Sequence, residues 1–211
     1  QFHPLHRGFD ASQGMGAARI RELQFAAERE AGIEGATFRA SDAQRAEVFP
    51  VDLLPRIVAA EEWATLVPGI AQRSLALNAF IDDVYGARAI LDDEVVPAEI
   101  LDLAPGFRQS GFAQAAGGVR NHISGLDMVC TGPGQWMVME DNLRVPSGIG
   151  YAMSIRRVNA RVIGQPPSDY RLLDPEEAPD YLRRTLLAAV PSHAGDDPGL
   201  ALVSSGPHDL A

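Results

Sequence analysis

The sequence contains no lysine, because all 18 of its basic residues are arginine. The chain therefore lacks the side chain that often stands beside nucleotide phosphates as a mobile point charge. It carries 28 acidic residues, which gives a net charge of −10 at pH 7. Nucleic-acid backbones are bound by clustered positive charge, so this balance, without a basic stripe, argues against a nucleic-acid partner.

Cysteine and long apolar runs are also scarce. Cys130 is the single cysteine, which excludes an internal disulfide and is typical of a reducing compartment. Its apolar neighbours favour a small buried hydrophobic side chain over a reactive thiol. No apolar stretch is long enough to cross a bilayer. These absences predict a cytoplasmic protein without a membrane partner.

The composition is otherwise that of an ordinary globular protein, with 46% hydrophobic and 22% charged residues in a chain of 211. This length allows one sizeable core or two small ones. Gln1 in place of Met suggests a processed or trimmed segment. His3, His6 and Asp10 could ligate a metal, but we interpret residues 1–12 as an irregular terminus.

The hydrophobic periodicity predicts a mixed α/β (α+β) fold. Helical patterns, with caps and first-turn prolines at several starts, predict helices over 14–31 after Ser12, 59–66, 69–85 after Pro68, 97–103, 150–163 and 174–190. Extended patterns cover 37–39, 48–58, the segment from Val119, and 200–203. We therefore expect a helix-rich region over 1–118 and a region built on an antiparallel sheet over 119–211.

The chemically informative segment is a predicted hairpin. Its strands are 126–130 and 135–141, joined by a turn over 131–134. This loop length pairs Cys130 with Gln135 and places Asp127 opposite Val138, with Glu140 on the diagonal. One face then carries Asp127, Val129, Val138, Glu140 and Asn142. The other, apolar face carries Leu126, Met128, Cys130, Met137 and Met139, and a slip of one residue would bury Asp127 there.

Two carboxylates and an amide oxygen on one face suit a hard cation, and Mg²⁺ is typically held by one or two carboxylates together with phosphates and water. No Cys/His spacing of a zinc site is present. Arg144 follows, where a planar cation could meet phosphate oxygens. Ser147 and Gly148 lead into a helix whose N–H groups could bind an anion. On spacing alone, a solvated turn with Asp127 paired to Arg144 explains the segment equally well.

Two motifs favour the metal site. Residues 121–127 (NHISGLD) and 139–148 (MEDNLRVPSG) resemble the signature of the circularly permuted ATP-grasp family, which is similar to glutathionylspermidine synthase. Weaker similarity extends through four upstream segments, 48–56, 72–80, 83–86 and 95–99. The resemblance covers about residues 35–165.

The resemblance implies an ATP-dependent ligase that joins a small carboxylate to an amine through an acyl-phosphate. Asp127, Glu140 and Asn142 match the Mg²⁺ ligands of the family, and Arg144 falls where a phosphate contact is expected. Related ligases can carry an arginine two residues before the metal aspartate, where this sequence has Gly125.

The same resemblance implies a domain organisation. Residues 1–118 would form the region that precedes the ATP-grasp domain, and 119–211 would form the first part of that domain. The lysines and adenine-binding strands of the family's later half are expected after Ala211, since the sequence reaches a predicted strand and a glycine turn and then stops. The 211 residues alone are then expected to be inactive.

Two alternatives remain open. The chain could be a binding or scaffold module that keeps the fold without the chemistry, as Gly125 and the missing lysines allow. It could also be an unrelated metal-dependent hydrolase, for which His122 is the only base close to the carboxylates in sequence. In the predicted register His122 lies on the face of Leu126, away from Asp127, which disfavours the hydrolase.

Overall fold

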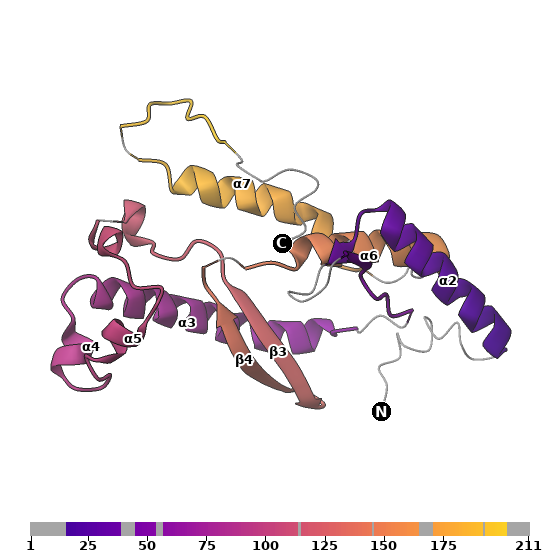
Figure 1. The fold of residues 1–211 in the computed structure, drawn as a ribbon, viewed down its shortest axis with the longest axis horizontal. Helices are drawn as coiled ribbons and strands as arrows, with labels where there is room; N and C mark the ends of the chain where they lie inside the picture. Colours follow the sequence, from indigo (N-terminus) through magenta and orange to yellow (C-terminus); the bar gives the residue numbers. More distant parts are fainter. Residues whose placement is uncertain are drawn as a thin grey trace. The chain divides into compact units, whose positions relative to one another are not determined.

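A computed structural model describes residues 16–38, 45–53, 57–113, 115–144, 146–164, 171–191 and 193–201 (Figure 1). The contacts group the chain into two units: 1–59 with 147–180 and 201–211, and 60–146 with 181–200. Helices and two antiparallel strand pairs make up these units, which confirms the mixed α/β fold. These contact-based units do not test the predicted division into regions 1–118 and 119–211, which stays a prediction.

The first unit is built on two helices, α2 (Ala17–Ile33) and α6 (Ile149–Val162). Ala27 and Ala31 of α2 and Val158 of α6 are fully buried. The small side chains on α2 let α6 approach closely, and Ile155 and Val162 pack against the same core. Helix α2 ends at Ile33, two residues beyond its predicted end at residue 31.

Two short strands, β1 (Thr37–Phe38) and β2 (Glu47–Val48), pair antiparallel beside these helices. The Tyr151 hydroxyl donates a hydrogen bond of 2.6 Å to the Thr37 carbonyl, which ties β1 to α6. The strand predicted over 37–39 is thus present at its described residues, and 49–53, part of the extended pattern over 48–58, is non-helical.

An ion-pair network joins the same helices. Glu34, just after α2, accepts hydrogen bonds from Arg157 Nε at 2.9 Å and from Arg161 Nη1 at 2.5 Å. Arg157 also pairs with Glu176. Hydrogen bonds from the two guanidinium groups hold the pKa of the Glu34 carboxyl below its ordinary value, and the bond from Arg157 has the larger effect.

The second unit is organised around one long helix, α3 (Ala60–Val84). The sequence predicts two helices separated before Pro68, and this prediction is wrong: Pro68 lies inside a continuous helix of 25 residues. Proline removes one backbone donor and is disfavoured in a helix interior, yet a helix can accommodate it with local bending. The residues before and after Pro68 keep the helical conformation, so one proline does not divide the helix.

Short helical segments follow α3. These are α4 (Ala89–Asp92), α5 (Ile100–Leu103) and the 3₁₀ turns η1 (Gln109–Phe112) and η2 (Ala116–Gly118). Stacked and edge-to-face contacts link the rings of Tyr85, Phe107 and Phe112 with centroids 5.0–5.9 Å apart. The strand predicted from Val119 begins only at Gly125, and residues 119–124 are bends and irregular backbone.

The last described helix is α7 (Ala178–Ala188), preceded by η3 (Pro175–Glu177). Asp174 caps it by accepting a hydrogen bond of 3.0 Å from the Glu176 N–H, as the Asp-Pro pair predicts. Leu200 lies in no strand. The predicted roles of His3, His6, Asp10, Ser12 and 202–203 lie outside the described residues. None of the helices in the described ranges is both long and apolar enough to cross a membrane.

Candidate metal and nucleotide site

The predicted hairpin is present in the second unit. Strands β3 (Gly125–Gly132) and β4 (Gln135–Asn142) pair antiparallel around a turn at Pro133 and Gly134. Gly134 adopts a positive φ of 68°, which glycine reaches without steric cost. The connection is therefore two residues long, shorter than the predicted loop over 131–134.

The pairing of the strands differs from the prediction. Asp127 lies opposite Glu140, and Met128 lies opposite Val138. The predicted pairing of Asp127 with Val138 is wrong by two positions, because the shorter turn pairs Gly132 with Gln135. Met139 is an extra, bulged residue on β4. Thr131 is a second extra residue, on β3. Bulges of this kind leave a residue unpaired and turn the strand locally.

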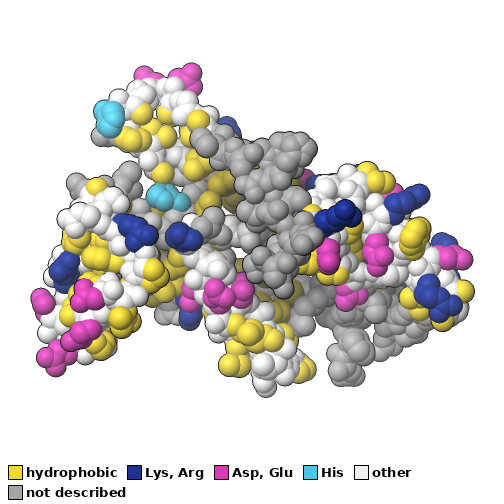
Figure 2. Space-filling model, viewed as in Figure 1, with side chains coloured by type: hydrophobic (Ala, Val, Ile, Leu, Met, Phe, Trp, Pro, Cys, Tyr) yellow, Lys and Arg dark blue, Asp and Glu magenta, His cyan; other side chains and the backbone are white. Residues whose placement is uncertain are grey.

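The bulge also changes which side chains share a face. Met137 is 58% and Met139 75% exposed, so their predicted position on the buried face is wrong. Val138 instead joins the half-buried face, where Leu126, Met128 and Cys130 lie as predicted. In Figure 2, acidic side chains gather over the open end of the hairpin and hydrophobic ones cover the part nearer its turn.

Asp127, Glu140 and Asn142 share the exposed face at the open end of the hairpin. Asp127 and Glu140 are direct cross-strand partners, and Asn142, two residues beyond Glu140, pairs with Gly125. The Asn142 Nδ2 atom lies 3.4 Å from Asp127 Oδ1 in a long hydrogen bond. Among the described residues no cation pairs with either carboxylate, so the alternative ion pair between Asp127 and Arg144 is not formed.

The donor set fits a hard cation. It offers two carboxylates and one amide, and rotating the Asn142 amide exchanges its nitrogen for its oxygen. Like charges directly opposite each other on a strand pair destabilise it, and a bound cation removes that repulsion. Within the described ranges no three His, Cys, Asp or Glu side chains gather closely enough to hold a metal, so a cation here would also need the amide and ligands from outside the hairpin.

Side chains from α3 and the segment before β3 hold the open end of the hairpin. Arg73 donates to Asp141 through Nε at 2.7 Å and through Nη2 at 2.5 Å. Asn121 Nδ2 donates to the Leu143 carbonyl at 2.5 Å, and the backbone N–H of Asn121 donates to Asn78 Oδ1 at 3.1 Å. Arg73 and Asn78 fall within segment 72–80, which resembles the family, but only the fold shows what these two residues contact.

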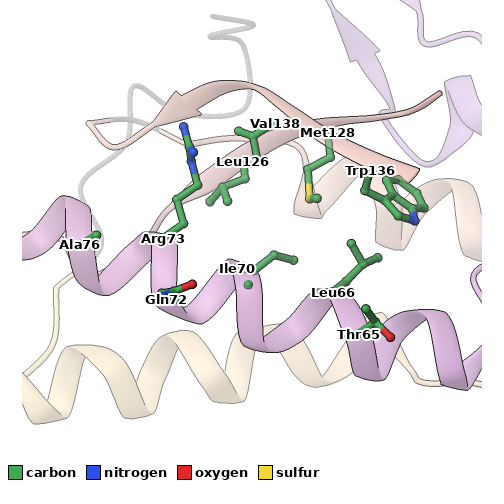
Figure 3. A pocket seen from close by; sticks show the side chains of 11 residues that line it. Thr65, Leu66, Ile70, Gln72, Arg73, Ala76, Leu126, Met128, Trp136 and Val138 are labelled. Carbon is green, nitrogen blue, oxygen red and sulfur yellow. The ribbon is translucent and has the colours of Figure 1, made fainter. Parts of the chain in front are cut away.

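Beneath the hairpin, its half-buried face and α3 line an open cavity of about 530 Å³. Leu66, Ile70 and Ala76 of α3 line it opposite Leu126 and Met128 (Figure 3). Its lining is apolar in the middle and becomes polar where Arg73 rises toward the strands (Figure 3). The face that the sequence predicts to be buried is therefore only loosely covered in this unit.

Gly125 lies in a confined position at the start of β3. A Cβ atom at this position would lie 2.9 Å from Pro146 Cβ and 3.5 Å from Asn142 Cβ. A contact of 2.9 Å forces one of the two atoms to move, so no larger side chain fits between the strand end and Pro146.

The remaining predicted site residues lie next to the hairpin in sequence. Arg144 is exposed and forms no hydrogen bond or ion pair among the described residues. Gly148, with φ 111°, precedes α6, whose first N–H groups receive no side-chain cap. Ser147 is exposed. His122 is also exposed and lies before β3, so the strand register that was used to orient it does not apply.

Several known proteins are similar in sequence to this chain. A sequence profile described as "Circularly permuted ATP-grasp type 2" matches residues 55–211. A Frankia casuarinae protein named "Putative glutamate--cysteine ligase 2-2" is 44% identical over 186 residues, 87% of this chain and 21% of that protein. A Frankia alni protein named "Putative glutamate--cysteine ligase 2-3" is 42% identical over 93% of this chain and 23% of its own.

An uncharacterized Synechocystis protein is 42% identical over 75% of this chain and 34% of its own length. The chain thus spans between about a fifth and a third of the relatives that it matches. The profile covers most of the chain, including α3 and the whole hairpin with Asp127, Glu140 and Asn142. The chain therefore belongs to the circularly permuted ATP-grasp family.

Proposed function

We propose that the chain is part of an ATP-dependent ligase that joins a carboxylate to an amine. The observation that carries this proposal is the direct opposition of Asp127 and Glu140 on one exposed face, next to the Asn142 amide. A protein gains nothing in stability from two opposed carboxylates without a cation. Family membership supplies the nucleotide chemistry that such a pair of carboxylates would serve.

Each site residue has a proposed role. Asp127, Glu140 and Asn142 would hold Mg²⁺, and Arg144, whose guanidinium group is exposed, would contact the phosphates of ATP. Bound there, Mg²⁺ would neutralise phosphate oxygens and make the γ-phosphorus more electrophilic. The uncapped N–H groups after Ser147 and Gly148 would bind an anionic group of a substrate.

The proposed reaction has two steps. A carboxylate oxygen of the first substrate attacks the γ-phosphorus of ATP, ADP leaves, and an acyl-phosphate forms. The amine of the second substrate then attacks the acyl carbon, phosphate leaves with the bonding electron pair, and the amine proton passes to solvent. The residues of this chain bind and orient the phosphates, while the absence of lysine leaves further phosphate contacts to the rest of the protein.

The names of the Frankia proteins make glutamate and cysteine the first substrates to assay. The named activity belongs to proteins of which this chain matches 21–23%, so we treat it as a starting point for the full-length protein. A cytoplasmic location, where ATP is available, agrees with this proposal and stays a prediction.

Calorimetry with Mg-ATP tests the proposal on the full-length protein. We expect Asp127→Ala and Glu140→Ala to weaken binding at least about tenfold and to abolish ADP release. Asp93→Ala, which removes an exposed carboxylate from a turn of the same unit, is the matched control and should bind normally. We expect no turnover from the 211-residue segment alone. If the full-length protein fails to bind Mg-ATP, or if both variants keep turnover, the proposal is wrong.

A non-catalytic binding module is the second candidate. The close approach of Gly125 to Pro146 favours it, since this contact removes the position of an arginine found in related ligases. A binding module would show normal Mg-ATP affinity in the full-length protein and no ADP release with any carboxylate and amine tested. ADP release that depends on both substrates would exclude it.

A further inference from the structure

We propose that the Arg73–Asp141 ion pair is a positioning device that aims Glu140 and Asn142 at the metal. Arg73 extends from α3 toward β4 and donates a hydrogen bond to each carboxylate oxygen of Asp141, from Nε at 2.7 Å and from Nη2 at 2.5 Å. The Asp141 side chain is 16% exposed and that of Arg73 45%. Two parallel hydrogen bonds fix direction as well as distance, which a single contact does not.

The position of Asp141 in the strand lets the ion pair orient both of its neighbours. Asp141 stands between Glu140 and Asn142, and alternate residues of a strand point to opposite faces. Asp141 pairs with Leu126, whose side chain lines the cavity beside Arg73 (Figure 3). Holding Asp141 down toward α3 therefore turns both neighbours up to the face of Asp127.

The bulge at Met139 makes such an anchor necessary. Strand register is normally set by the alternation of apolar and polar side chains along both strands. Here the extra residue interrupts that alternation immediately before the ligands, and Met139 and Glu140 are both exposed. Beyond the bulge the ladder has three pairs, which end with Gly125, a residue without a side chain to pack.

Electrostatic repulsion acts against this arrangement before a cation binds. Asp127 and Glu140 repel each other, and rotation of the end of β4 would separate them. The contact of Asn121 with the Leu143 carbonyl fixes the backbone after β4 but leaves the direction of the side chains open. The ion pair opposes the rotation itself, so it prepares the metal ligands in advance.

The inference rests on the proposed function, and metal binding by the full-length protein tests both. Mn²⁺ accepts the same oxygen ligands as Mg²⁺, and the paramagnetic resonance signal of free Mn²⁺ reports its binding without turnover. Asp141→Asn and Arg73→Gln each remove the ion pair. Asp82→Asn is the matched control, since it removes another arginine pair of α3, Asp82 with Arg120 at 2.8 Å. Thermal unfolding is recorded for every variant.

We expect Asp141→Asn and Arg73→Gln to bind Mn²⁺ about 10–100-fold more weakly than the wild type, the usual effect of losing a group that orients a metal ligand. The double variant should bind no more weakly than either single one, because both substitutions break the same contact. Asp82→Asn should stay within about twofold of the wild type, even where it lowers the melting temperature.

Two results would overturn the positioning role and leave the proposed function intact. One is wild-type Mn²⁺ affinity in Asp141→Asn while Glu140→Gln loses binding. The other is an equal loss in Asp82→Asn, which would mean that any weakened contact of α3 suffices. If the wild type binds no Mn²⁺, or if Asp127→Asn and Glu140→Gln bind it normally, the proposed function itself fails and the inference fails with it.

Discussion

At the scale of single residues, Glu140 shows a conflict between stability and function. It lies directly opposite Asp127, and among the described residues neither carboxylate has a cationic partner. We expect Glu140→Gln to raise the melting temperature of the full-length protein without Mg²⁺, because one of two like charges is removed. The rise that Mg²⁺ causes in the wild type should disappear.

Thermal melts with and without Mg²⁺ measure both effects. Glu99→Gln neutralises an exposed carboxylate in the same unit and should change neither melting temperature. A lower melting temperature for Glu140→Gln in the absence of Mg²⁺ would contradict the repulsion argument.

Gly125 makes a second prediction at this scale. We expect Gly125→Ala to destabilise the protein by about 1–3 kcal/mol, since a new Cβ at 2.9 Å from Pro146 overpacks the strand end. Gly69→Ala is the control, because a Cβ in that helical position meets nothing within 4 Å. Alanine is a better helix former, so the control should stabilise by about 0.5–1 kcal/mol. Urea unfolding of the full-length protein compares the two, and equal effects would refute the steric explanation.

At the scale of elements, the contact between α2 and α6 depends on pH. Arg157 and Arg161 hold the pKa of Glu34 below its ordinary value of 4.5. A group with a lowered pKa in the folded state stabilises the fold at pH values above the unfolded pKa. That contribution is lost as the pH falls through the lower, folded pKa, because the unfolded chain takes up the proton first.

The difference in free energy of unfolding between wild type and Glu34→Gln should therefore be complete at pH 7 and should shrink as the pH falls below about 4.5. Urea unfolding at several pH values measures this difference. In a background that carries Arg157→Gln and Arg161→Gln the difference should nearly vanish at every pH, because the partners are gone. A difference that grows on acidification would show that the sign of the argument is wrong.

The elements also show where prediction from sequence succeeds and fails. Periodicity places α2, α6 and both strands of the hairpin to within a few residues, and the Asp174-Pro175 cap correctly places η3, since these signals are local. The bulge at Met139 is not local: it depends on how β4 meets β3 and α3, and methionine fits a buried or an exposed position equally well. The common face of the candidate ligands is correct although the pairing used to predict it is wrong.

The continuous α3 and the Arg73–Asp141 pair were beyond prediction for a related reason. A rule for proline in helices counts the hydrogen bond lost at Pro68 and does not count the helical turns before and after it, which continue into one helix of 25 residues. The partner of Arg73 lies 68 positions along the chain, so no spacing rule connects the two residues. Local signals indicate the candidate ligands, and long-range contacts decide how these side chains are held.

At the scale of the whole molecule, apolar burial is unevenly shared between the two units. Of the fully described buried hydrophobic side chains, only Val84 belongs to the second unit, whereas the core around Ala27, Ala31 and Val158 belongs to the first. Local stability follows buried apolar contact. We therefore expect slower amide hydrogen exchange in α2 and α6 than in the hairpin when the 211-residue chain is studied alone.

Hydrogen exchange followed by mass spectrometry measures this order directly. In the full-length protein, Mg-ATP should slow exchange most strongly over residues 125–142, because a ligand that binds the ordered hairpin opposes its opening. Peptides of α2 should change little and serve as the internal control. If the hairpin of the isolated chain exchanges as slowly as α2, the loosely covered face above the cavity does not govern its stability, and the site is more rigid than its packing indicates.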